Sequence, residues 1–121
     1  MTPPELPPLT DATLWDILDD RLSDERAMAL VWQAIGYVRD PETGLWSGDQ
    51  ADPHWREEYP TPPNFIESRP ATVKLTRSIP AEYKQLLKEE LKFKGYPIGQ
   101  LIPRLTRRAT IVSWLLAYRR R

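Results

Sequence analysis

The sequence predicts an α+β fold: a mainly helical single domain with a small antiparallel sheet. Apolar side chains recur at helical spacing in several separate segments. Two short apolar pairs also flank a turn that contains proline and glycine, as in a β-hairpin. The chain has 121 residues and is 40% hydrophobic, which is enough for one core. We therefore expect a globular domain over residues 10–121, preceded by a flexible proline-rich arm over residues 1–9.

The first two helices are expected over residues 10–22 and 23–35. Thr10 or Asp11 is the predicted N-cap of the first, and Ser23 is the predicted N-cap of the second. Gly36 should end the second helix, because glycine readily takes the left-handed conformation found after helices.

A β-hairpin is predicted next, with Tyr37–Val38 and Leu45–Trp46 as its strands. Pro41 favours the turn, and Gly44 can take the left-handed position of a bulged loop. A short helix is expected after Asp52, which can cap it.

The second half is expected to contain one strand and two further helices. Residues 71–77 alternate apolar and polar side chains, which predicts a half-buried strand that could join the hairpin. Helices are predicted from Ser78 to Lys94, ended by Gly95, and over residues 105–118. The predicted core includes these apolar residues: Leu18, Trp32, Leu75, Leu87, Val112 and Leu116.

The charges divide sharply along the chain. Residues 1–67 carry fourteen acids and four arginines, for a net charge of −10, whereas residues 68–121 carry thirteen lysines and arginines and three acids, for +10. Such a division indicates electrostatic pairing, either between the two halves or with an outside partner.

Six basic residues are the main candidate binding groups. The spacing of Lys84, Lys88 and Lys92 places them on one edge of the predicted 78–94 helix. Arg104, Arg107 and Arg108 lie at the start of the last helix, where positive charge opposes the helix dipole. The compensating charge is either a set of acids from the first half or a bound anion.

These residues favour a non-enzymatic interaction module that binds an acidic protein surface. The alternative is RNA binding through the same basic surface, with Phe93 and Tyr96 as exposed aromatic side chains on which bases stack. A second alternative is a small enzyme with a site near His54, the single histidine. We expect His54 to be structural, because no nucleophile motif accompanies it.

The composition also bears on cofactors, metals and location. The chain has no cysteine, and we expect no disulfide, no metal site and no cofactor. The same absence fits a reducing compartment, and we expect a cytoplasmic protein without a membrane span.

Five segments carry a resemblance to a known family. They are Leu14–Leu18, Asp40–Gly44, Ala71–Pro80, Lys92–Tyr96 and Arg107–Thr110. Together they resemble a small protein family of unknown function from cyanobacteria and plastids. The resemblance implies a photosynthetic source and a stand-alone domain, and it supplies no activity, cofactor or catalytic residue.

Overall fold

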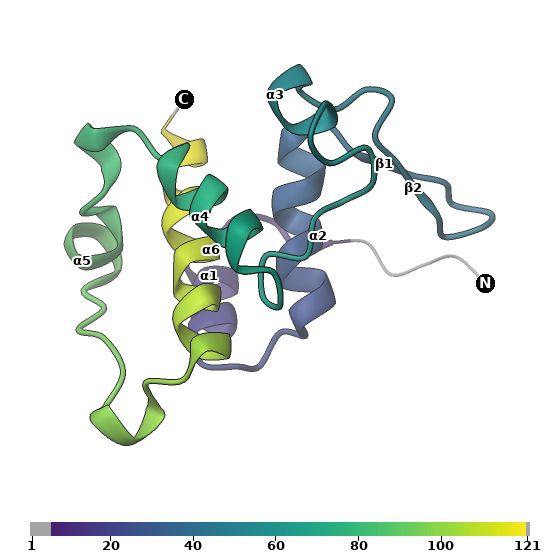
Figure 1. Ribbon diagram of the computed structural model, residues 1–121. Coiled ribbons are helices and arrows are strands. Elements are labelled where there is room, and N and C mark those ends of the chain that lie inside the picture. The colour runs from purple at the N-terminus through teal and green to yellow at the C-terminus, as the bar shows by residue number, and fades with distance from the viewer. Residues whose placement is uncertain (1–5, 121) are drawn as a thin grey trace.

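The structure, a computed structural model, describes residues 6–120 and is built around one long helix, α6 (Pro103–Arg119). Figure 1 shows this helix at the centre of the molecule. It packs against four other helices: α1 (Asp11–Leu18), α2 (Asp24–Ile35), α4 (Arg69–Arg77) and α5 (Leu86–Leu91). The prediction of a mainly helical α+β fold is confirmed.

The first two helices begin at their predicted caps. The Thr10 hydroxyl accepts a hydrogen bond from the Thr13 N–H, and the Ser23 hydroxyl accepts one from the Arg26 N–H, both at 3.2 Å. Gly36 ends α2 with φ of +115°, as predicted. α1 ends at Leu18, earlier than expected, and the connection to α2 turns at Asp20 with φ of +62°.

The predicted hairpin is present as β1 (Val38–Arg39) and β2 (Trp46–Ser47). The strands are antiparallel, with Val38 opposite Ser47 and Arg39 opposite Trp46. Gly44 has φ of +77°, and its N–H donates to the Asp40 carbonyl at 2.8 Å. The hairpin projects from the side of α2 that faces away from α5 (Figure 1).

The short helix α3 (Pro53–Arg56) follows the hairpin and begins at the predicted cap. The Asp52 carboxylate accepts a hydrogen bond from the His54 N–H at 2.9 Å, and proline stands at the first helical position.

The predicted strand over residues 71–77 is wrong, because this segment is helical. Ser68 caps α4 by accepting a hydrogen bond from the Ala71 N–H, and Pro70 lies in the first turn. Ala71 and Leu75, four residues apart, are both fully buried. Only Ala71 and Leu75 face the core; Val73, between them, lies on another side of the helix and is half-buried. The sheet has only two described strands.

The predicted helix over residues 78–94 is divided into two shorter pieces. A 3₁₀ turn, η1 (Ala81–Tyr83), precedes α5, and no side chain caps the start of α5. α5 ends before Lys92, which takes the left-handed conformation with φ of +57°, so Gly95 is not its stop. Lys84, Lys88 and Lys92 consequently do not share one continuous helix.

A second 3₁₀ turn, η2 (Ile98–Gln100), leads into α6.

The buried core contains Leu18, Trp32, Leu75, Val112 and Leu116 as predicted, whereas Leu87 is half-buried. Of the expected N-terminal arm, residues 1–5 lie outside the described residues. Leu6 and Leu9 are half-buried against the core.

Candidate functional site

Arg104 and Arg108 lie at the start of α6 and are bound by acids of the first half. Arg108 is fully buried; its Nε donates to the Ile17 carbonyl at 3.0 Å, and it also donates to the Leu22 carbonyl. One of its terminal nitrogens donates to Asp24 at 2.6 Å. Arg104 binds both Asp20 oxygens, at 2.6 and 2.8 Å, and the second oxygen of Asp24 at 3.0 Å.

The acids of this cluster balance the positive charge of the two arginines at the start of α6. Hydrogen bonds donated by Arg104 lower the pKa of Asp20, and donation to the Asp20 and Asp24 carboxylates raises the pKa of Arg104. Of the two alternatives left open by the sequence, internal acids rather than a bound anion hold these arginines. The structure therefore removes Arg108 from any docking surface, because its side chain is enclosed by the fold.

Arg107 has a different environment. It is half-buried and donates a hydrogen bond to the Ile66 carbonyl, and no carboxylate among residues 6–120 pairs with it. Together with Arg69 and Arg77 of α4 it lines a shallow groove of about 330 Å³.

The lysines form a separate exposed surface on and after α5. Lys84, Lys88, Lys92 and Lys94 are all exposed, and we call them the lysine surface. Lys88, Lys92 and Lys94 line a groove of about 700 Å³ together with Gln85, Glu89 and Phe93. Within the described part of the chain, none of the four lysines forms an ion pair: the ion pairs of α5 are made by Glu90, which binds Arg119 and Arg120.

Phe93 and Tyr96 anchor the segment that follows α5. The Phe93 ring packs edge-on against Trp15 at 6.0 Å and against Tyr96 at 5.1 Å between centroids. The Tyr96 hydroxyl donates to the Leu18 carbonyl at 2.8 Å, and burial raises its pKa. Both side chains are half-buried, so they hold the segment against α1 and do not form a fully exposed stacking surface.

An exposed apolar segment lies next along the chain and was not predicted as functional. We call residues 98–102 the apolar loop. Ile98 is 90% exposed, Leu101 56% and Ile102 47%. The available signal was three large apolar residues between Pro97 and Pro103, in a stretch too short to bury a helical face.

His54 lies at a pocket of about 240 Å³ that also contains Asp52, Lys74 and Ser78. Lys74 and Ser78 already have hydrogen-bond partners within the fold. Lys74 donates to the His54 carbonyl at 2.7 Å and to Glu58 at 2.9 Å. The Ser78 hydroxyl donates to the Leu75 carbonyl and accepts from the Trp114 indole. The nearby carboxylates, Asp52 and Glu58, are exposed to solvent.

In residues 6–120, no group of three or more His, Asp or Glu side chains is placed to hold a metal ion. None of the described helices combines the length and apolarity needed to cross a membrane.

Comparison with known proteins places the chain in a family. No curated protein matches it. It is similar to a protein of known solution NMR structure, with 66% sequence identity, 93% of each chain covered and a TM-score of 0.80. The family model of DUF1823, a domain of unknown function, matches residues 8–120. This match spans nearly the whole chain, which therefore belongs to the DUF1823 family.

Proposed function

We propose that this protein is a non-enzymatic interaction module that binds an acidic protein through the lysine surface and the apolar loop. The observation that carries the proposal is the distribution of unpaired charge. Arg104, Arg108, Arg119 and Arg120 pair with acids of the same chain, whereas the four lysines have no ion-pair partner among the described residues.

The apolar loop favours a protein over RNA as the partner. It lies directly after the lysines in the chain and exposes three large aliphatic side chains. An exposed apolar centre beside a charged rim is typical of protein interfaces, in which the buried centre supplies affinity and the rim supplies orientation. Single-stranded RNA instead requires exposed aromatic faces, and the aromatic side chains here are half-buried.

We also propose a cellular role and a location for the protein. A role as an accessory or assembly factor in a photosynthetic cell rests on the resemblance of the sequence to a cyanobacterial and plastid family. A cytoplasmic location rests on the absence of cysteine.

The test is an NMR titration of the isotopically labelled chain with a synthetic acidic amphipathic helix, which carries leucines on one face and glutamates on the other. We expect the amide signals of residues 84–102 to shift and binding to weaken as salt rises. The double variant K88Q/K92Q should bind about fivefold more weakly, from two rim charges worth about 0.5 kcal/mol each. I98S/L101S should lose binding without loss of stability, because both side chains are exposed.

The matched control for charge is K88R/K92R, which keeps both positive charges and should bind like the unaltered chain. Oligouridine and phosphatidylserine vesicles serve as competing probes. Tighter binding of either one than of the peptide would replace the proposed function with RNA or membrane binding. Peptide binding that is equal in K88Q/K92Q and in the unaltered chain would also overturn the proposal.

A further inference from the structure

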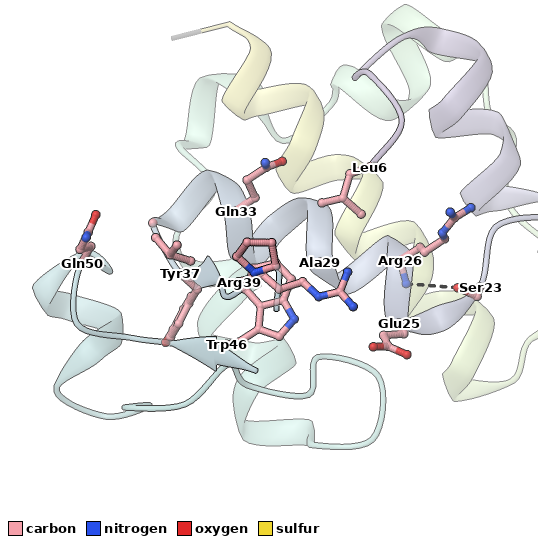
Figure 2. Close-up of a pocket in the computed structure, with 13 residues that line it drawn as sticks. Leu6, Ser23, Glu25, Arg26, Ala29, Gln33, Tyr37, Arg39, Trp46 and Gln50 are labelled. Atoms are coloured by element: carbon pink, nitrogen blue, oxygen red, sulfur yellow. Dashed lines mark hydrogen bonds between the residues drawn. The ribbon is translucent and has the colours of Figure 1, made fainter. Parts of the chain in front are cut away.

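Another groove lies between α2 and the hairpin. Its volume is about 750 Å³, within the range of small-molecule sites. In Figure 1 the hairpin and α5 lie on opposite sides of α6, so this groove is remote from the lysine surface. Figure 2 shows that α2 forms one wall, the hairpin forms the second, and Leu6 approaches from the opposite side.

One side of α2 faces the groove. Arg26, Ala29, Gln33 and Gly36 all line the groove, and they recur at the spacing of a single helical face. Ala29 leaves space that a larger side chain would fill. Gly36 has no room for a side chain, because an added Cβ would lie 2.7 Å from the Gln50 carbonyl oxygen.

Trp46 provides a fixed aromatic wall. It packs edge-on against Trp32, with ring centroids 5.3 Å apart. Trp32 is itself held by a 2.8 Å hydrogen bond from its indole N–H to the Pro63 carbonyl. Trp46 remains half-buried and lines the groove beside Val38, which is 47% exposed. The hairpin thus offers apolar surface to a ligand at a defined place.

Two arginines bring unpaired positive charge to the same groove. Arg26 comes from the first turn of α2 and Arg39 from β1. In Figure 2 the Arg39 side chain extends along α2 toward the end that carries Glu25 and Arg26. Neither guanidinium forms an ion pair or a hydrogen bond within residues 6–120, in contrast to those of Arg21, Arg104 and Arg108. Among the residues that the structure describes, Glu25 is the one acid that lines the groove, so the two arginines give its described walls a net positive charge.

We propose that this groove binds a small organic anion. The apolar or aromatic body of the ligand packs against Trp46 and Val38, and its carboxylate or phosphate group is held by Arg26 and Arg39. A guanidinium group presents paired donors that match both acid groups. The concave shape and the volume favour a small molecule over a protein surface.

The proposal is tested by NMR titration with three anions and their neutral counterparts. Benzoate and indole-3-acetate carry a carboxylate, and phenyl phosphate carries a phosphate. Benzamide, indole-3-acetamide and phenol have similar bodies without the charge. We expect at least one anion to shift the Trp46 indole signal and the Ala29 and Gln33 amides, and its neutral counterpart to bind more weakly. Comparison of the two carboxylates with phenyl phosphate shows which of the two acid groups the groove binds.

Variants separate this site from the lysine surface. R26Q and R39Q should each weaken anion binding about tenfold, the loss expected for a charge-assisted hydrogen bond. Both should keep the dispersed spectrum of a folded chain, because neither guanidinium has an internal partner among the described residues. R69Q on α4 and the K88Q/K92Q variant should bind the anion as the unaltered chain does. The proposal is overturned if no anion shifts these signals, if each neutral compound binds as tightly as its anion, or if R26Q and R39Q have no effect.

Discussion

The buried guanidinium of Arg108 and the carboxylate of Asp24 form a 2.6 Å ion pair between α6 and the first turn of α2. The two residues are 84 positions apart in the chain. Arg108 also donates to the carbonyls of Ile17 and Leu22, so one side chain joins the end of α1, the α1–α2 connection and α2. Arg104 extends the cluster to Asp20. This cluster links the acidic and basic halves of the chain inside the fold.

Replacement of Arg108 by Ala should lower the free energy of unfolding by about 3 kcal/mol or more. The change leaves the Ile17 and Leu22 carbonyls without their donor and opens a cavity beside α6. Urea denaturation measures the effect. R69A, which removes an exposed arginine, should change stability by less than about 0.5 kcal/mol. An R108A chain as stable as R69A would contradict the structural role of the cluster.

Asp20 should make stability depend on acid pH. Its pKa is lowered from 3.8 by the Arg104 hydrogen bonds, so its contribution is present above about pH 4 and is lost as pH falls through the lowered value. D20N should therefore be less stable than the unaltered chain at neutral pH, and the difference should shrink below about pH 4. Asparagine tolerates the positive φ of this position, so the substitution tests charge. D49N, at an exposed carboxylate outside the cluster, is the control. A difference that does not change with pH would refute the assignment.

Tyr37 should affect stability in the alkaline range. Burial raises its pKa from 10.0 to about 12, and its hydroxyl donates to the Tyr59 carbonyl at 2.6 Å. A raised folded-state pKa stabilises the fold below the unfolded value, and this contribution is lost as pH rises through about 12. The stability difference between the unaltered chain and Y37F should thus decrease across that interval. Spectrophotometric tyrosine titration of both chains should assign the transition near pH 12 to Tyr37. The same titration curve in both chains would exclude it.

Gly36 and Gly95 form a matched pair for testing backbone geometry. Both have positive φ, +115° and +94°, but a Cβ at Gly36 would lie 2.7 Å from the Gln50 oxygen, whereas at Gly95 nothing lies within 4 Å. G95A should lower the free energy of unfolding by about 1 kcal/mol from conformational strain alone. G36A should lower it by about 3 kcal/mol, because the backbone clash adds to the strain. Equal losses in thermal or urea unfolding would show that the α2–hairpin junction can move apart without cost.

Local signals in the sequence were sufficient for much of the first half. Ser23, Gly36 and the Asp40–Gly44 turn act through hydrogen bonds and backbone angles within a few residues of themselves. Such interactions depend little on the rest of the chain, and these predictions are confirmed.

The same reasoning failed where two local structures fit one pattern. The apolar residues of segment 71–77 suit a strand as well as a helix, and the helix is favoured by its Ser68 cap and by burial of Ala71 and Leu75 in a core that includes α6. α5 likewise ends before Lys92, which takes the left-handed conformation, and not at Gly95. The groove lined by Arg26, Arg39 and Trp46 was not predicted, since it arises from the approach of the hairpin to α2.

The sequence by itself determined the helical character of the chain, its hairpin and the division of its charges. It did not determine which charges would pair, because each basic residue had several acids available and the partners lie far apart along the chain. Tertiary packing decided this by bringing the start of α6 against the α1–α2 connection, where Asp24 lies within 2.6 Å of the buried Arg108. The lysines on and after α5 were left at the surface without an ion pair within residues 6–120. The physical reason is that an ion pair depends on distance and desolvation in three dimensions, and neither can be read from sequence spacing.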